Sequence, residues 1–247
     1  TVCIASKILN IPFIIYENNL HIGKTNKYLL PFAKKILVSN KELSGVPKKY
    51  NGKVIQIGNI IRKEIINHSK NVNLDAIDKK LSILILGGSQ AAKVFAEVLP
   101  FIFQECKNSG ISFKLYQQCL PEQNDFLNKF YNKINIQFEI FNYSKNILDY
   151  FSKANLAITR SGSSMLAELI NVKIPFISVP LPSAADNHQY KNAIFYEKKQ
   201  FCYLIEEKDL KNKLFKMIKK INNDKSLLKN MILKQQQFSD KLVYERI

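Results

Sequence analysis

The chain has 247 residues, 46% of them hydrophobic, and its 37 Lys and Arg against 20 Asp and Glu give a formal net charge of +17. This length suits one large domain, or one domain and part of another. No apolar run approaches the ~20 residues that span a bilayer, and no signal peptide is recognisable. We therefore do not expect an integral membrane protein.

The positive charge has two candidate origins. A basic protein can bind nucleic acid, anionic lipid or a phosphorylated substrate. However, Lys, Asn and Ile are abundant while Gly, Ala and Arg are few, which is typical of an AT-rich genome. The lysines do not cluster, and there is no zinc-finger spacing or RNA-binding signature, so we expect no nucleic-acid partner. The four scattered cysteines predict buried thiols in a reducing compartment, without disulfides or a metal site.

The first quarter of the chain contains three short predicted strands, at residues 13–15, 36–38 and 54–57, and a helix over 24–32. Residues 2–5 are already apolar, so we expect the chain to be cut from a longer protein.

From residue 82 on, predicted strands alternate with helical patterns. Near-continuous apolar strands separated by helices indicate a parallel sheet that is covered by helices on both faces. These strands are expected at 82–86, 113–117, 136–140, 156–159, 176–179 and 202–205.

The sequence therefore predicts an α/β protein made of two units. Residues 63–236 form a complete doubly wound domain, and residues 1–62 form the tail of a second Rossmann-like unit. A last helix is predicted over 227–246, polar enough to pack across a domain boundary, and we expect residues 237–247 to lie back on the first unit.

The most informative motif, RSGSSMLAE over 160–168, follows the predicted strand 156–159. It puts small residues where a helix must begin, and Glu168 about one and a half turns into that helix. Such a helix start offers free N–H groups and the positive end of the helix dipole to a phosphate. A carboxylate at the position of Glu168 can accept hydrogen bonds from ribose hydroxyls.

A second polar helix start, DNHQYKNA over 186–193, follows the predicted strand 176–179. Ligands of open α/β sheets bind outside the carboxyl ends of the strands. The two helix starts together therefore predict a nucleotide-type donor site.

A competing interpretation concerns GGSQA at 87–91, which comes close to the nucleophile elbow of a hydrolase. Asp149 and His188 even follow Ser89 in the order of an α/β-hydrolase triad. However, His188 begins a predicted helix, and no H-G-G-G-type oxyanion segment is present. The same turn would serve as a phosphate cradle through the Ser89 hydroxyl and backbone N–H groups, and we favour that role.

Five motifs stand in the order that is typical of the MurG family of glycosyltransferases, which this chain resembles over almost its whole length. The family transfers N-acetylglucosamine (GlcNAc) from UDP-GlcNAc to lipid I, which makes lipid II for peptidoglycan and so serves cell-wall synthesis, cell shape and division. The resemblance implies a two-domain GT-B architecture, inversion at the anomeric carbon, and no metal or other cofactor. Its motifs are YENNLHIGKTNK at 16–27, GNIIR at 58–62, GGSQ at 87–90, RSG at 160–162 and AADNHQ at 184–189.

The resemblance assigns roles to individual residues. Asn19 and Gln189 would bind the GlcNAc, while Arg62 and Ser89 would hold the diphosphate of the leaving UDP. Asn19 and Gln189 have an alternative as caps or turn residues, and Arg62 as a surface ion-pair partner.

The resemblance also assigns a uracil site and a donor helix. The backbone near Tyr143 and Ser144 would face uracil. The donor helix would supply its N-terminus to the diphosphate and Glu168 to the ribose, with a solvated helix acid as the alternative for Glu168. Its substrate-binding residues are Ser163, Ser164, Met165, Leu166, Ala167 and Glu168.

The chain departs from the family in several places. Ala91 stands where the family has Gly, Ile60 where it has Pro, and Tyr16 where it usually has His. The family's Gly-rich loop, with the His that is its candidate general base, would lie upstream of Thr1. The catalytic base is therefore not identified; Glu17 is a cleft acid that we do not assign as the base. Two alternatives stay open: another GT-B UDP-sugar transferase, or a noncatalytic remnant that binds nucleotide sugar.

A lipid acceptor implies a peripheral enzyme at the cytoplasmic face of the bacterial inner membrane. Apolar residues at 29–32 (LLPF) precede Lys34 and Lys35, a combination that suits contact with anionic lipid. In the alternative, Leu29 and Phe32 face a core and the lysines are simply solvated. A rival apolar stripe at 210–221 is better explained as core.

Overall fold

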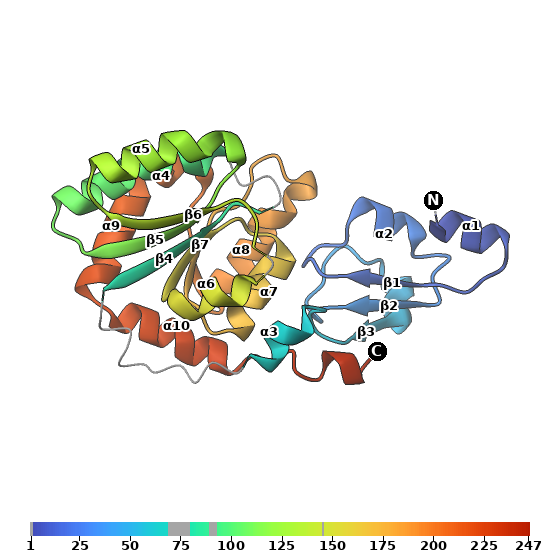
Figure 1. The fold of residues 1–247 in the computed structure, drawn as a ribbon. Coiled ribbons are helices and arrows are strands. Elements are labelled where there is room, and N and C mark those ends of the chain that lie inside the picture. The colour runs from blue at the N-terminus through green and yellow to red at the C-terminus, as the bar shows by residue number, and fades with distance from the viewer. Residues whose placement is uncertain (1, 69–79, 89–92, 145) are drawn as a thin grey trace.

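The structure, a computed structural model, describes residues 2–68, 80–88, 93–144 and 146–247, and Figure 1 shows two adjoining units. The first contains a sheet of order β1-β2-β3 and the second a sheet of order β6-β5-β4-β7-β8-β9. Every strand pairing is parallel. The α/β fold class that the sequence predicts is confirmed.

The strands begin and end within two residues of their predicted bounds. They are β1 Ile14–Glu17, β2 Lys35–Val38, β3 Val54–Gln56, β4 Leu81–Leu86, β5 Phe113–Gln118, β6 Gln137–Phe141, β7 Leu156–Thr159, β8 Phe176–Ser178 and β9 Cys202–Leu204. The α-helices are α1 Val2–Ile8, α2 Lys24–Leu29, α3 Lys63–Asn67, α4 Lys93–Asn108, α5 Asn124–Lys133, α6 Ile147–Lys153, α7 Ser163–Asn171, α8 His188–Lys198, α9 Leu210–Asn223 and α10 Ser226–Gln236.

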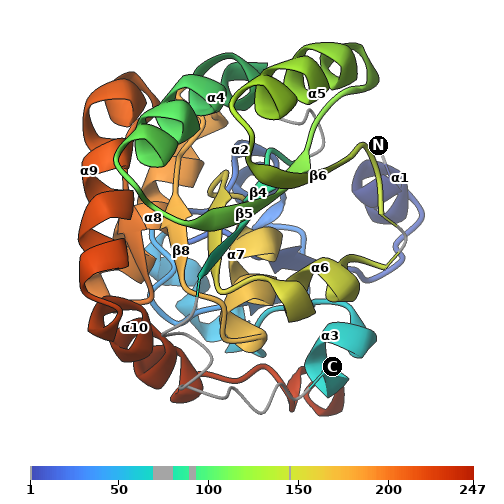
Figure 2. The same ribbon diagram turned by 60° about the vertical axis from the view of Figure 1, so that its left-hand side comes forward.

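Helices cover both faces of the larger sheet, with α4, α5 and α9 on one side and α6 and α7 on the other (Figure 2). Side chains of a strand point alternately to the two faces. In β4, Ile83 and Ile85 therefore join the core under α4 and α9, while Leu84 and Leu86 join the core under α6 and α7. This double burial explains why the strands read as continuous apolar runs.

The chain order of the larger sheet reverses between β4 and β7, which are neighbours although β5 and β6 intervene in the sequence. Ligands of open α/β sheets bind outside the carboxyl ends of the strands at such a switch point. Here Gly87 and Gly88 follow the end of β4, and the turn at 160–162 leads from β7 into α7. The fold thus brings two predicted motifs together.

The C-terminal tail differs from the prediction. The helix predicted over 227–246 is wrong beyond Gln236, where α10 ends. The following residues turn because Asp240 points inward, 4% exposed, and its carboxylate accepts hydrogen bonds from the backbone and side-chain amides of Asn59 (2.8 and 3.1 Å). The Tyr244 hydroxyl donates to the carbonyl oxygen of Ile61 (2.7 Å). The tail therefore lies on the linker between the two units, residues 57–62.

The N-terminal unit also corrects details of the prediction. The helix predicted over 24–32 ends at Leu29, and Leu29 and Leu30 are buried in the small core, so neither contacts a lipid surface. Phe32 is 38% exposed, and Lys34 and Lys35 are exposed. In the described part of the chain, none of the helices is both long and apolar enough to cross a membrane.

The rival apolar stripe is indeed core. It lies on α9, where Leu210, Leu214, Ile218 and Ile221 are buried and Met217 packs against the same cluster.

The cysteines are free thiols. Cys106, Cys119 and Cys202 are buried and Cys3 is partly exposed. Burial raises the pKa of Cys106 to about 12, so this thiol stays protonated and unreactive.

Candidate donor site

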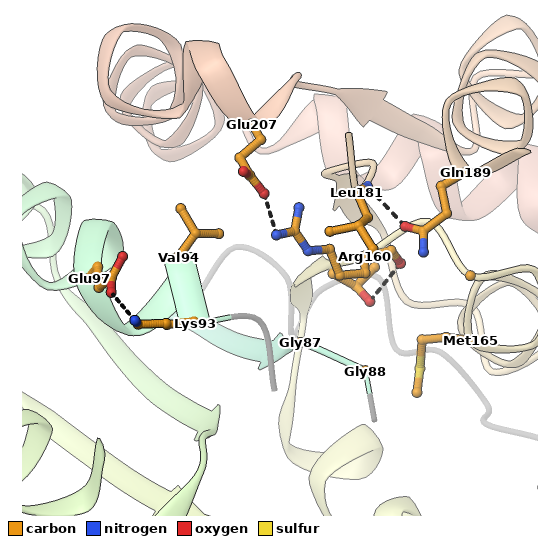
Figure 3. Close-up of a pocket in the computed structure, with 12 residues that line it drawn as sticks. Gly87, Gly88, Lys93, Val94, Glu97, Arg160, Met165, Leu181, Gln189 and Glu207 are labelled. Carbon is orange, nitrogen blue, oxygen red and sulfur yellow. Dashed lines mark hydrogen bonds and ion pairs between the residues drawn. The ribbon is translucent and has the colours of Figure 1, made fainter. Parts of the chain in front are cut away.

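A cavity of about 730 Å³ lies at the switch point of the larger sheet, and Figure 3 shows residues that line it. Its walls include Gly87 and Gly88 after β4, Gly162 and Met165 at the start of α7, and Gln189 of α8. It is therefore formed by three of the motifs that the sequence singled out.

The turn after β4 leaves room for a ligand close to its backbone. Gly88 has a φ of +77°, in the left-handed region that favours glycine, and no atom of the described residues lies within 4 Å of where a Cβ would be. Open space beside the backbone is what a phosphate needs in order to approach it. Ser89 and Gln90 lie outside the described residues, so the phosphate role of Ser89 stays a prediction.

The start of α7 offers free backbone donors. The first hydrogen bond of the helix runs from Leu166 N–H to the carbonyl of Gly162 (3.0 Å), so earlier N–H groups have no partner within the helix. Ser163 is buried and Ser164 exposed, while the side chains of Leu166 and Ala167 are fully buried in the core. Leu166 and Ala167, both predicted to bind substrate, therefore offer a ligand only backbone atoms.

Gln189 ties two turns of the site together. Its Oε1 accepts hydrogen bonds from the backbone N–H groups of Ser161 (3.1 Å) and Leu181 (3.0 Å). Before it, Asp186 and Asn187 both adopt left-handed φ values, 51° and 54°. Such strained positions cluster at ligand sites. Only the Nε2 donor of Gln189 is left for a sugar.

A partly buried ion pair lies at one wall of the cavity (Figure 3). The Arg160 guanidinium, in a residue 8% exposed, donates to the Glu207 carboxylate and to the carbonyl of Pro180 (3.3 Å). Its centre lies 5.0 Å from the ring centroid of Phe95. Sequence reasoning gave Arg160 no separate role and missed Glu207, because nothing local marks a pair 47 residues apart.

Asn192, also missed, joins the two units. It is 1% exposed, and its amide donates to Asn19 Oδ1 (3.1 Å) and to the carbonyl of Ser161 (3.2 Å). Its Oδ1 accepts the N–H of Leu20 (3.2 Å). Asn19 thus lies against the turn before α7. A signal was present: Asn192 stands three positions after Gln189, on the same helix face.

Glu17 is occupied by its own loop. Its carboxylate accepts hydrogen bonds from the backbone and side-chain amides of Asn19 (both 3.0 Å), the N–H of Gly23 (2.8 Å) and the side chain of Asn26 (3.0 Å). With four donors and 4% exposure, Glu17 shapes the loop between β1 and α2, and a base would need a freer carboxylate.

Arg62 and Glu168, predicted to hold different parts of the donor, bind each other. Arg62 Nε and Nη2 lie 3.0 and 2.7 Å from the two carboxylate oxygens. This hydrogen bonding with Glu168 raises the pKa of Arg62 above its ordinary value. Tyr143 is 79% exposed in the loop after β6, and Ser144 beside it is partly exposed.

Asp149 and His188 do not contact each other as the hydrolase alternative would require. The Asp149 carboxylate, on α6, accepts a hydrogen bond from Asn146 (2.9 Å), and His188 Nδ1 lies 2.7 Å from the carbonyl oxygen of Ala185. Asp149 and His188 thus have different partners, and Ser89 lies outside the described residues.

Comparisons with known proteins give a consistent family. Residues 82–247 match the family model described as glycosyltransferase family 28 C-terminal domain. The UDP-N-acetylglucosamine–N-acetylmuramyl-(pentapeptide) pyrophosphoryl-undecaprenol N-acetylglucosamine transferase of Pelagibacter ubique is 36% identical over 236 residues, which are 93% of this chain and 65% of that protein. The enzyme of that name from Rickettsia felis is 34% identical over 90% of this chain and 64% of its own length. The chain therefore spans about 65% of the length of these curated relatives.

Solved structures show the same fold. Acinetobacter baumannii MurG superposes on 99% of this chain and 68% of its own, with a TM-score of 0.78 at 23% identity. The complex of S. aureus MnaA with UDP covers 99% of this chain and 69% of its own, with a TM-score of 0.71 at 14% identity.

Proposed function

The chain belongs to the MurG family of glycosyltransferases, and from this premise we propose that it transfers GlcNAc from UDP-GlcNAc to lipid I. The product would be lipid II, so the chain would serve peptidoglycan synthesis and, through it, cell shape and division. The observation that carries the proposal is the cavity at the β4–β7 switch point, between a glycine turn and the free N-terminus of α7. Backbone donors on two sides suit a diphosphate.

In the proposed reaction the C4 hydroxyl of the MurNAc sugar attacks C1 of GlcNAc as the bond to UDP breaks, with inversion. The donors at Gly87, Gly88 and the start of α7 stabilise the negative charge that develops on UDP, and Ser89 and Arg62 add to them. Glu168 would hold the ribose, and the backbone at Tyr143 and Ser144 would face the uracil.

The sugar would lie beside the cleft. Gln189 offers its Nε2, and Asn19 lies next to it because Asn192 holds Asn19 against the turn before α7. Asn19 already accepts one bond and donates another to Glu17 (3.0 Å), so contact with GlcNAc requires these bonds to rearrange. No described side chain is assigned as the base that takes the hydroxyl proton.

Calorimetry without added metal tests the donor site. UDP should bind with higher affinity than ADP, because the pyrimidine contacts near Tyr143 would not suit a purine. Glu168→Ala should weaken UDP binding by about 1–3 kcal/mol through the loss of charge-assisted hydrogen bonds to the ribose. Glu122→Ala, which removes an exposed acid elsewhere, is the matched control. Absence of UDP binding, or equal affinity for ADP, would contradict the site.

A lipid acceptor places the enzyme at a membrane surface, and we propose a peripheral contact at the cytoplasmic face of the inner membrane. Leu29 and Leu30 are buried, but Pro31 and Phe32 are exposed next to Lys34 and Lys35. An aromatic ring beside basic side chains suits an anionic interface, where each Lys contributes about 1 kcal/mol.

Liposome sedimentation tests this surface. Lys34→Glu with Lys35→Glu should reduce binding to anionic vesicles about tenfold or more at low salt, and raised salt should reproduce the loss for the unaltered chain. The reversal of Lys129 and Lys133, exposed on α5, is the control of equal charge. If both double variants bind alike, the contact lies elsewhere.

A further inference from the structure

The pair of Arg62 and Glu168 connects the linker to the donor helix. Arg62 is the N-cap residue of α3 at the end of the linker, and Glu168 lies on α7. The guanidinium donates through Nε and Nη2 to both oxygens, at 3.0 and 2.7 Å, which is the strong fork geometry of an arginine and a carboxylate.

The two partners differ in exposure. The side chain of Glu168 is 9% exposed and that of Arg62 is 40% exposed. Glu168 therefore reaches almost no solvent while Arg62 covers it. Since the Arg62 side chain is partly exposed, its guanidinium has contact with solvent as well as with the carboxylate.

The proposed donor site gives each partner a second task. Glu168 is the acid for the ribose hydroxyls, and it stands five positions after Ser163, about 7.5 Å along the helix axis from the phosphate-facing first turn. A ribose diol needs the two oxygens that now accept from Arg62. Arg62 is in turn the cation that would hold the diphosphate.

We propose that the Arg62–Glu168 pair is a specificity gate that admits a nucleoside diphosphate to the donor site and disfavours the free nucleoside. The proposal rests on the donor site above. Ribose binding displaces the guanidinium from Glu168. If the ligand carries a diphosphate, the guanidinium exchanges one anion for another. If the ligand is a nucleoside, no anion replaces the carboxylate, so the cost of opening the pair is not offset.

Removal of Arg62 should therefore act in opposite directions on two ligands. In Arg62→Ala, uridine should bind about tenfold more tightly, because the carboxylate is free for the ribose. UDP should bind about tenfold more weakly, because the diphosphate loses its cation. Calorimetry with uridine and UDP measures both. Lys129→Ala, which removes an exposed charge on α5, should change neither.

The outcomes separate the gate from the donor site. If the unaltered chain does not bind UDP, the donor site fails and the gate fails with it. If the unaltered chain binds UDP but Arg62→Ala weakens both ligands, or leaves their ratio unchanged, the gate alone is overturned. Arg62→Lys keeps the charge without the fork. It should tighten uridine about threefold and leave UDP nearly unchanged. Should Arg62→Ala not fold, unchanged uridine affinity in Arg62→Lys overturns the gate.

Discussion

Tyr16 and Ile60, which the resemblance marks as departures from the family, contact each other. The Tyr16 hydroxyl accepts the N–H of Ile60 (3.0 Å) and donates to the carbonyl of Gly58 (3.3 Å). A Pro at position 60 would have no N–H to satisfy. Ile60 supplies that donor, and the Tyr16 hydroxyl accepts from it. Burial raises the pKa of Tyr16, so its hydroxyl stays protonated and can donate.

This pairing predicts non-additive effects of substitution. Tyr16→Phe should lower the free energy of unfolding by about 1 kcal/mol, because Ile60 N–H and Gly58 C=O lose their partner. In an Ile60→Pro background the same change should cost roughly half as much, since only the carbonyl remains to be satisfied. Urea unfolding of the single and double variants measures the coupling, and strictly additive costs would contradict it.

At this scale the sequence located residues better than it identified their partners. The motifs correctly placed a helix start at Ser163 and another at His188. They did not reveal that the side-chain oxygen of Gln189 accepts hydrogen bonds from two backbone amides. Nor did they reveal that Arg62 and Glu168, 106 positions apart, pair with each other. Such partners depend on where the sheet brings distant turns together, which local pattern does not encode.

Among the elements, strands were more predictable than helix ends. Burial on both faces gives the central strands β4, β7 and β8 a compact apolar run between polar segments, and the run itself fixes its limits. A helix end depends on tertiary contacts: α10 stops at Gln236 because the inward-pointing Asp240 binds Asn59 and Asn171, neither of which is near it in sequence.

The end of α7 shows a second tertiary contact of this kind. Lys173, just beyond the helix, has a φ of +60°, a region that usually requires Gly or Asn. Its Nζ donates to the carbonyls of Gln235 (2.8 Å) and Phe238 (2.7 Å), which joins α7 to the end of α10 and the tail. Burial lowers the pKa of Lys173 to about 8.

The lowered pKa predicts how stability changes with pH. Between about pH 8 and pH 10.5 the folded chain has released the Lys173 proton while the unfolded chain retains it, so this residue makes stability rise with pH. Because Lys173 is half-buried, solvent screening limits the gain to on the order of 1 kcal/mol. Urea unfolding at pH 7.5 and 10 should show this gain in the unaltered chain and in Lys129→Met, but not in Lys173→Met. Equal pH slopes for the chain and Lys173→Met would contradict it.

At the scale of the whole molecule, the contacts that bridge the two units include three that use a buried side chain: Asn192, Glu168 or Asp240. Asn192 binds Asn19 and Leu20 beside the donor site, Arg62 binds Glu168, and the tail closes over the linker through Asp240. Two of the three involve residues that the donor or sugar is proposed to bind, so ligand binding would act directly on the junction. The third lies away from the cavity and holds the linker whether or not a ligand is present.

The linker contact at Gly58 predicts how strongly the tail holds the two units together. Gly58 has a φ of +103°, and a Cβ there would lie 2.7 Å from Asp240 Oδ1, so Gly58→Ala both strains the backbone and pushes the tail away. Gly52→Ala is the matched control, since no atom in the described part of the chain lies within 4 Å of its Cβ position and its φ is not positive.

Gly58→Ala should therefore lower the free energy of unfolding by about 1–3 kcal/mol, and Gly52→Ala should change it by less than about 0.5 kcal/mol. Displacement of Asp240 also uncovers the backbone of the linker, so limited proteolysis should cleave near Asn59 faster in Gly58→Ala. Since the bonds of Asn192 with Asn19 and Leu20 are left intact, UDP affinity should change less than stability does. A Gly58→Ala chain as stable and as protease-resistant as Gly52→Ala would mean that the tail does not hold the linker.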